Sequence, residues 1–79
     1  RQGLDRPREE LRVRAVRDAL SSLPLDQRAA VALRDLEGYR SSDAAAILGI
    51  AEPALKARLH RGRMRLRSLL ADLARDGEW

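Results

Sequence analysis

A stripe of apolar residues between positions 55 and 70 most tightly limits how this chain can fold. At 100° per residue, the apolar positions of this segment fall within an arc of about 120°, as on the buried side of a long amphipathic helix. These positions are Leu55, Leu59, Gly62, Leu66, Leu69 and Leu70. The stripe therefore predicts one long helix whose apolar edge lies in a small core.

The same segment is the most basic part of the chain. Residues 54–70 contain six Lys and Arg residues and no acidic residue, whereas the rest of the chain contains ten basic and twelve acidic residues. Ordinary surface helices carry both signs of charge, so a helix whose exposed sides are wholly positive is typical of a protein that binds a polyanion such as nucleic acid. A merely solvated helix face is the alternative.

Composition favours a small all-α domain. Seventy-nine residues make one domain with a modest core. The chain has no Phe, one Tyr and one Trp, whereas sheets are enriched in aromatic and β-branched residues. The absence of Cys excludes disulfides and thiolate zinc sites, and a single His disfavours a histidine site, so we expect no metal and no cofactor.

The sequence also indicates the cellular location of the protein. It contains no signal peptide and no apolar run long enough to cross a bilayer, so we expect a cytoplasmic protein without a membrane partner. Because the sequence begins with Arg1, we expect it to be a piece of a longer protein.

Four helices are predicted. Residues 1–6 are expected to be a linker remnant, and Pro7 to open a first helix that Pro24 ends. A second helix follows as far as Leu36, with Gly38 as its C-terminal cap. The apolar faces of these two helices are expected to comprise Val13, Val16, Ala19, Leu20 and Leu23, and Ala29, Ala30, Leu33 and Leu36.

The second half of the chain has the spacing of a helix-turn-helix. A short helix is predicted over residues 41–48, a turn over 49–51 and a recognition helix over about 52–70, within a domain of residues 7–75 followed by a tail of 76–79. Ala45 is small where the two helices cross, and Gly49, four residues later, stands where the backbone needs a positive φ. The second helix of such a motif enters the major groove of DNA.

Three stretches of the chain, residues 33–39, 45–50 and 55–63, together resemble a known family. With Leu23-Pro24 and Arg28 upstream, they are similar to the C-terminal promoter-recognition region, the fourth conserved region, of bacterial extracytoplasmic-function sigma factors. The resemblance covers roughly residues 11–70. It implies a four-helix domain of the sigma region four type, related to winged-helix domains but without a wing. It also implies binding to the minus-35 element of double-stranded promoter DNA, docking on the β-subunit flap of RNA polymerase and sequestration by an anti-sigma protein. We expect the domain to be a monomer.

The resemblance also implies which residues contact DNA. On the recognition helix these are Lys56, Ala57, Arg58, His60, Arg61 and Arg63, and upstream of it Arg34. Ser41 is a further candidate for a DNA contact. Lys and Arg can bond to guanine in the major groove or neutralise phosphates. Arg63, with Arg65 and Arg67, is expected to serve phosphates, the polymerase or solubility. Arg34 has an alternative role in a local ion pair with Asp35 or Glu37.

The chain departs from the family pattern at three positions. Arg40 stands where the family has Ser or Thr, so Ser41 or Ser42 would have to cap the short helix. Ala54 and Ala57 replace two hydroxyl residues, and each lost hydrogen bond to DNA would cost about 1 kcal/mol. Altered base preference or weaker DNA binding follows from these changes.

Several other functions compete with this interpretation. A helix-turn-helix output domain of a LuxR-type regulator shares the pattern of residues 49–59, and a sigma-like protein-interaction module bound by an anti-sigma factor would tolerate the missing hydroxyls. An amphipathic membrane-surface helix is disfavoured because the apolar stripe is needed for the core. Ser41, Asp43 and His60 do not have the spacing of a catalytic triad, so neither an enzyme nor a small-molecule substrate is expected.

Overall fold

The computed structural model describes residues 2–75, and the side chains of residues 9–75. It contains α1 (Gln2–Ser21), α2 (Leu25–Val31), η1 (Ala32–Leu36), α3 (Ser41–Leu48) and α4 (Glu52–Arg75), with no strand among the described residues. The short segment η1 continues α2 as a wider, π-helical turn, in which the N–H of Glu37 donates to the carbonyl of Ala32 at 2.9 Å. The predicted all-α, four-helix architecture is confirmed.

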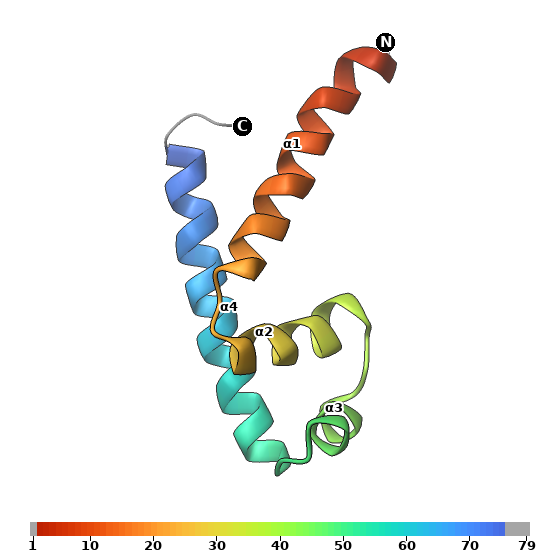
Figure 1. The fold of residues 1–79 in the computed structure, drawn as a ribbon, viewed down its shortest axis with the longest axis vertical. Coiled ribbons are helices and arrows are strands. Elements are labelled where there is room, and N and C mark those ends of the chain that lie inside the picture. The colour runs from red at the N-terminus through yellow and green to blue at the C-terminus, as the bar shows by residue number, and fades with distance from the viewer. Residues whose placement is uncertain (1, 76–79) are drawn as a thin grey trace.

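The long helix α4 is the central element of the domain (Figure 1). The α2 helix crosses it near the middle, and α3 packs against its N-terminal part. The α1 helix approaches α4 at its C-terminal end and then diverges from it, so that the first turns of α1 and the last turns of α4 lie apart at the same end of the molecule. The resulting shape is elongated, with extents of 46 × 24 × 14 Å.

The core lies where α2, α3 and α4 meet. Its buried members are Leu23, Ala30, Val31, Ala44, Ala45, Leu55 and Leu59, with Leu20, Leu33, Leu48, Ile50, Leu66 and Leu69 packed around them. Leu55 is fully buried, and the two alanines of α3 are the small residues that let this helix lie close to α4. The apolar stripe of the sequence therefore faces the core, as predicted.

Two residues predicted for the core lie at the surface instead. Val13 is 54% exposed because the N-terminal part of α1 leaves the body of the domain, and Leu36 is 62% exposed at the last turn of η1. Helical periodicity reports which side of a helix is apolar, but it does not report where along its length a neighbour stops covering that side.

Helix ends also differ from the sequence expectations. The α1 helix begins at Gln2, five residues before Pro7, so Pro7 lies inside the helix and not at its start. The α4 helix continues to Arg75, beyond the expected end near residue 70. The expected tail of residues 76–79 lies outside the described residues.

Neither serine caps α3. The N-cap position is Arg40, with φ −67° and ψ 157°, and no side chain makes a cap hydrogen bond there. Ser41 and Ser42 follow the N-cap as helical residues, one and two positions too late for their hydroxyls to bond to the free N–H groups of the first turn. The expected substitute cap is therefore absent.

Gly62 marks the point where α2 and α4 approach most closely. A Cβ atom at this position would lie 2.9 Å from Cγ2 of Val31, 3.2 Å from the carbonyl oxygen of Gln27 and 3.3 Å from its Cβ. Val31 is 2% exposed and β-branched, so it has little room to turn away, and the carbonyl belongs to the backbone of α2. Only glycine lets the two helices pack at this distance.

We therefore expect Gly62→Ala to lower the melting temperature, although alanine is the better helix former by about 1 kcal/mol. Overpacking costs typically 1–3 kcal/mol and outweighs that gain, and Gly62→Val should lower the melting temperature further. Thermal denaturation followed by circular dichroism measures both, with Ser68→Ala on the exposed side of α4 as the control expected to be neutral or mildly stabilising. A higher melting temperature for Gly62→Ala would show that the crossing has room for a methyl group.

Candidate nucleic-acid interface

The turn between α3 and α4 orients the two helices through left-handed backbone geometry at one residue. Gly49 has φ 69° and ψ 33°, as its place in the sequence predicted. The N–H of Gly49 donates to the carbonyl of Ala46 at 3.1 Å, and the N–H of Ile50 donates to that of Ala45 at 3.0 Å. This is the Schellman arrangement that ends a helix. Ile50 then packs against the core, which fixes the direction in which α4 begins.

Because Leu55, Leu59 and Gly62 bury one side of α4, the opposite side faces solvent. The exposed residues there are Ala54, Ala57, His60, Arg61 and Met64. Over the first three turns of α4, the exposed side of the helix-turn-helix thus consists of two alanines, His60 and Arg61. Arg61 and His60 make no ion pair with any of the described residues.

The other predicted DNA-binding cations on α4 have acidic neighbours. Lys56 Nζ lies 3.5 Å from Glu52 of the preceding turn, and Arg58 Nε lies 4.0 Å from Asp26 of α2. Both contacts are single and solvent-exposed, and such pairs are worth about 0–1 kcal/mol. A phosphate group can therefore displace either carboxylate at little cost.

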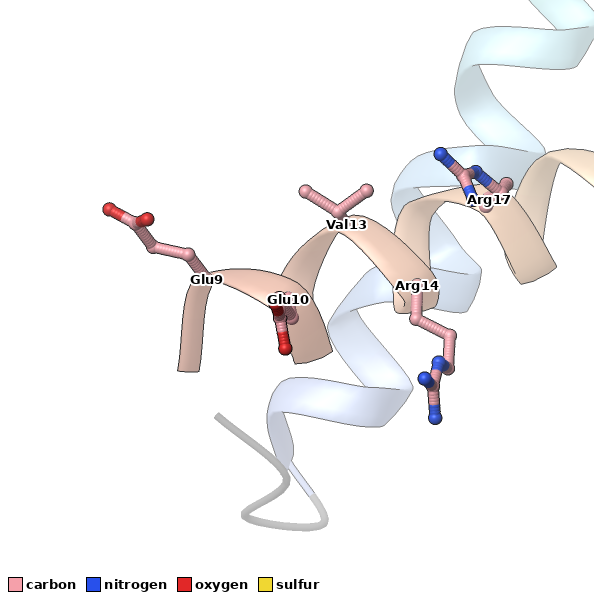
Figure 2. A pocket seen from close by; sticks show the side chains of 5 residues that line it. All are labelled: Glu9, Glu10, Val13, Arg14 and Arg17. Carbon is pink, nitrogen blue, oxygen red and sulfur yellow. The ribbon is translucent and has the colours of Figure 1, made fainter. Parts of the chain in front are cut away.

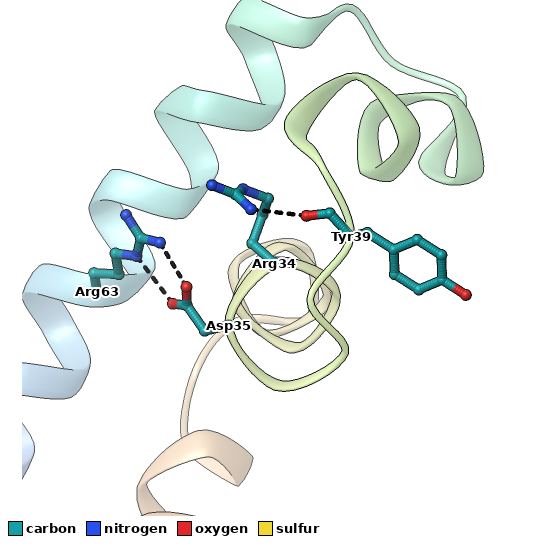
Figure 3. A network of polar contacts seen from close by, with 4 residues as sticks. All are labelled: Arg34, Asp35, Tyr39 and Arg63. Carbon is teal, nitrogen blue, oxygen red and sulfur yellow. Dashed lines mark hydrogen bonds and ion pairs between the residues drawn. The ribbon is translucent and has the colours of Figure 1, made fainter.

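Arg63 is held much more firmly. Its Nε donates to Oδ2 of Asp35 at 2.9 Å and its Nη2 donates to Oδ1 at 2.5 Å, which makes a two-pronged contact between α4 and η1 (Figure 3). These hydrogen bonds hold the pKa of the Asp35 carboxyl below its usual value; partial desolvation acts in the opposite direction, and the charges of Arg63 and Arg34 lower it further. The same hydrogen bonds raise the pKa of Arg63.

Arg34 forms neither of the local ion pairs that the sequence suggested. Its Nη1 donates instead to the backbone carbonyl of Tyr39 at 2.7 Å, across the turn that begins at Gly38, while the Tyr39 ring extends away from α4 (Figure 3). Its Nε is buried without a hydrogen-bond partner. Gly38 has φ 81°, which confirms it as the residue that ends the second helix. Arg34 thus ties η1 to the start of α3 and leaves part of its guanidinium unengaged.

Nothing among the described residues resembles a catalytic or metal site. No hydrogen bond joins Ser41, Asp43 and His60, and no group of three or more His, Asp or Glu side chains could hold an ion. A surface hollow on α1 has both signs of charge, and its side chains fan out around the helix without converging (Figure 2). No helix in the described range is long and apolar enough to cross a bilayer.

Sequence reasoning missed the roles of two acidic residues, Asp35 and Asp26. Asp35 lies 28 positions from Arg63, and Asp26 lies 32 positions from Arg58, so no local periodicity links them. The only available signal was the contrast between a wholly basic helix and the acidic surplus in the rest of the chain.

Residues 13–66, more than half of the chain, match the family described as "Sigma-70, region 4". The chain belongs to the sigma-70 region 4 family. This assignment confirms the resemblance drawn from the sequence and sets aside the LuxR-type alternative. The matched residues run from α1 through the helix-turn-helix to the middle of α4.

Similar proteins include three curated sigma factors. The chain is 49% identical over 59 residues to "ECF RNA polymerase sigma factor SigM" of Mycobacterium tuberculosis, which covers 75% of this chain and 30% of the relative. It is 47% identical over 53 residues to SigE of Mycolicibacterium smegmatis, a match that covers 67% of this chain and 21% of the relative. It is 43% identical over 56 residues to CarQ of Myxococcus xanthus, a match that covers 71% of this chain and 32% of the relative. This region 4 chain thus spans about a third or less of the length of these relatives.

The two-pronged ion pair predicts how the stability of the region 4 domain depends on pH. Because the pKa of Asp35 is lower in the folded state, the pair stabilises the fold above about pH 4, and this contribution is lost as the pH falls through the folded pKa. Asp35→Asn should lower the free energy of unfolding at pH 7 by roughly 0.5–1 kcal/mol, discounted for its exposure.

Urea denaturation from pH 7 to pH 2 tests this expectation. The difference between Asp35→Asn and the unaltered chain should shrink toward zero at the acid end. Glu37→Gln removes the same charge from an exposed neighbour without an ion pair among the described residues, and it serves as the control. A difference that stays constant down to pH 2 would mean that the carboxylate charge is not what stabilises the contact.

Proposed function

We propose that this domain recognises the minus-35 element of promoter DNA and docks on RNA polymerase, as part of an alternative sigma factor of the extracytoplasmic-function type. The observation that carries the proposal is the exposed side of α4, the second helix of the helix-turn-helix, where Arg61 follows Ala54 and Ala57 and forms no ion pair among the described residues. The sigma factors named among the relatives support the same function. No catalytic activity belongs to it, and a protein that works with RNA polymerase acts in the cytoplasm.

In this proposal the first turns of α4 enter the major groove. Ala54 and Ala57 allow the helix backbone to approach the base edges closely, and their methyl groups can contact the methyl group of thymine. Arg61, one turn further along the same face, reaches base edges and can form a two-pronged hydrogen bond with guanine. His60 lies beside it and contacts a base edge or a neighbouring phosphate.

The start of α3 suits a phosphate of the DNA backbone. No side chain caps this helix, so its first N–H groups remain available together with the Ser41 hydroxyl. Lys56 and Arg58, whose acidic partners are only weakly held, would turn to phosphates on either side of the groove. Arg34 uses Nη1 for the Tyr39 carbonyl, and its Nη2, which makes no hydrogen bond among the described residues, would supply a further phosphate contact near the end of η1.

A separate surface is available for the polymerase. An almost wholly apolar groove runs between α1 and η1, lined by Arg12, Val13, Val16, Arg17, Leu20 and Leu36. The two arginines at its rim favour an apolar segment flanked by acidic residues. We assign this groove to the β-subunit flap, and an anti-sigma protein that covered it or the basic face of α4 would block the domain.

Weak binding by the isolated, monomeric domain is part of the proposal. One small module contacts few phosphates and bases, so its affinity depends on being held near the promoter by the polymerase and by another promoter-binding domain of the same sigma factor. A protein-interaction module without DNA binding is the remaining alternative, and the next experiment separates the two.

Arg61→Ala should weaken binding to a duplex carrying the cognate minus-35 element by about 1–3 kcal/mol. If Arg61 also neutralises a phosphate, the substitution should reduce the slope of log affinity against log salt by about 0.9. Fluorescence anisotropy over a range of salt concentrations measures both. Arg14→Ala on exposed α1 removes the same charge and should change neither quantity appreciably. Salt-insensitive binding, or equal loss in both variants, would refute the recognition-helix assignment.

Val13→Glu and Leu36→Glu should weaken binding to the isolated β-flap at least tenfold, since each places a charge in the apolar groove. Both residues are already exposed, so the fold should persist, and DNA affinity should change little. Leu25→Glu, at an exposed leucine outside the groove, is the matched control. If all three variants bind the flap like the unaltered chain in a pull-down or calorimetric titration, the polymerase docks elsewhere.

A further inference from the structure

Arg63 points to a different side of α4 from Arg61. Two residues apart on a helix corresponds to a rotation of about 200°, so these arginines project from nearly opposite flanks. Arg63 lies one residue after Gly62, beside the crossing with α2, and its side chain reaches along η1 to Asp35 (Figure 3). Arg61 has no such neighbour among the described residues.

The contact with Asp35 occupies the two N–H groups on one edge of the Arg63 guanidinium and pairs its charge with a carboxylate. Recognition of a phosphate or carboxylate by arginine is strongest when two parallel N–H groups bind two oxygens, and Asp35 already accepts from Nε and Nη2 in this way. A DNA phosphate that binds through these same two N–H groups must first displace the carboxylate. Arg58 differs, because Asp26 meets it through a single contact at 4.0 Å.

We propose that Asp35 is a positioning residue that competes with DNA phosphate for Arg63, so that Arg63 serves the packing of η1 on α4 while Asp35 is present and becomes a phosphate contact only when Asp35 is removed. This inference rests on the proposed function, DNA binding by α4. It separates the arginines of α4 that are available to DNA from Arg63, which contacts Asp35 instead. It also makes Asp35 a determinant of how strongly the domain binds polyanions of any sequence.

The salt dependence of DNA binding distinguishes this role from a purely structural one. Each phosphate neutralised by a cation contributes about 0.9 to the slope of log affinity against log salt. In the 79-residue chain with Asp35 in place, Arg63→Gln should therefore leave the slope unchanged. Asp35→Asn should steepen it by about 0.9 and raise the affinity for a promoter duplex several-fold, because Arg63 is released.

A double-mutant cycle separates release of Arg63 from the general effect of removing an acid. Adding Arg63→Gln to Asp35→Asn should return the slope to its original value, whereas adding Arg63→Lys should keep the gain, because a phosphate contact needs only a positive charge. Glu37→Gln removes the same charge two residues from Asp35 and should leave the slope unchanged.

Three results would overturn the competition. One is a reduced slope for Arg63→Gln alone, which would mean that Arg63 contacts DNA while Asp35 holds it. The second is an equal gain for Glu37→Gln and Asp35→Asn, and the third is a gain in Asp35→Asn that survives the addition of Arg63→Gln. The same cycle measured as the salt concentration that elutes each variant from immobilised heparin needs no promoter recognition. Competition seen on heparin without promoter binding would show that Asp35 withholds Arg63 from polyanions and would refute the proposed function. Promoter binding without the expected cycle would refute the competition and leave the proposed function standing.

Discussion

The close approach of α2 to α4 at Gly62 governs the arrangement of the other helices. With no side chain at this position, Val31 and the backbone at Gln27 lie directly against α4. That contact sets the depth at which Leu55 and Leu59 enter the core and the distance at which α3 packs beside them. In a 79-residue domain with a small core, a shift of a few tenths of an ångström at this crossing would be felt across the whole packing.

The crossing also distributes the charges of the basic helix. Because α2 and η1 pass over α4, Asp26 comes near Arg58 on one side and Asp35 binds Arg63 on the other. The residues on the far side of α4, Arg61 among them, stay clear of these acids. The basic helix thus has one face without acidic neighbours among the described residues and two flanks whose arginines contact acidic residues. The face without acidic neighbours is the side that a helix-turn-helix presents to DNA.

Several elements were predictable because their causes are local. The positive φ of Gly49 follows from a glycine placed after a short apolar helix, and the burial of Ala45 and Leu55 follows from helical spacing. Other features were not predictable in this way. The exposure of Val13 and Leu36 depends on where α1 leaves the body. The missing serine cap depends on the start of α3, which lies one residue too early for Ser41 to be the N-cap.

The sequence by itself determined the fold class, the turn, the apolar stripe of α4 and the family, because each depends on residue types at fixed short spacings along the chain. Only the tertiary structure decided which arginines are free and which are held. The partners of Arg58 and Arg63 lie about thirty positions away, and their meeting depends on the angle and depth of one helix crossing. Charge is a property of the sequence, whereas the availability of a charge depends on which groups the packing brings beside it.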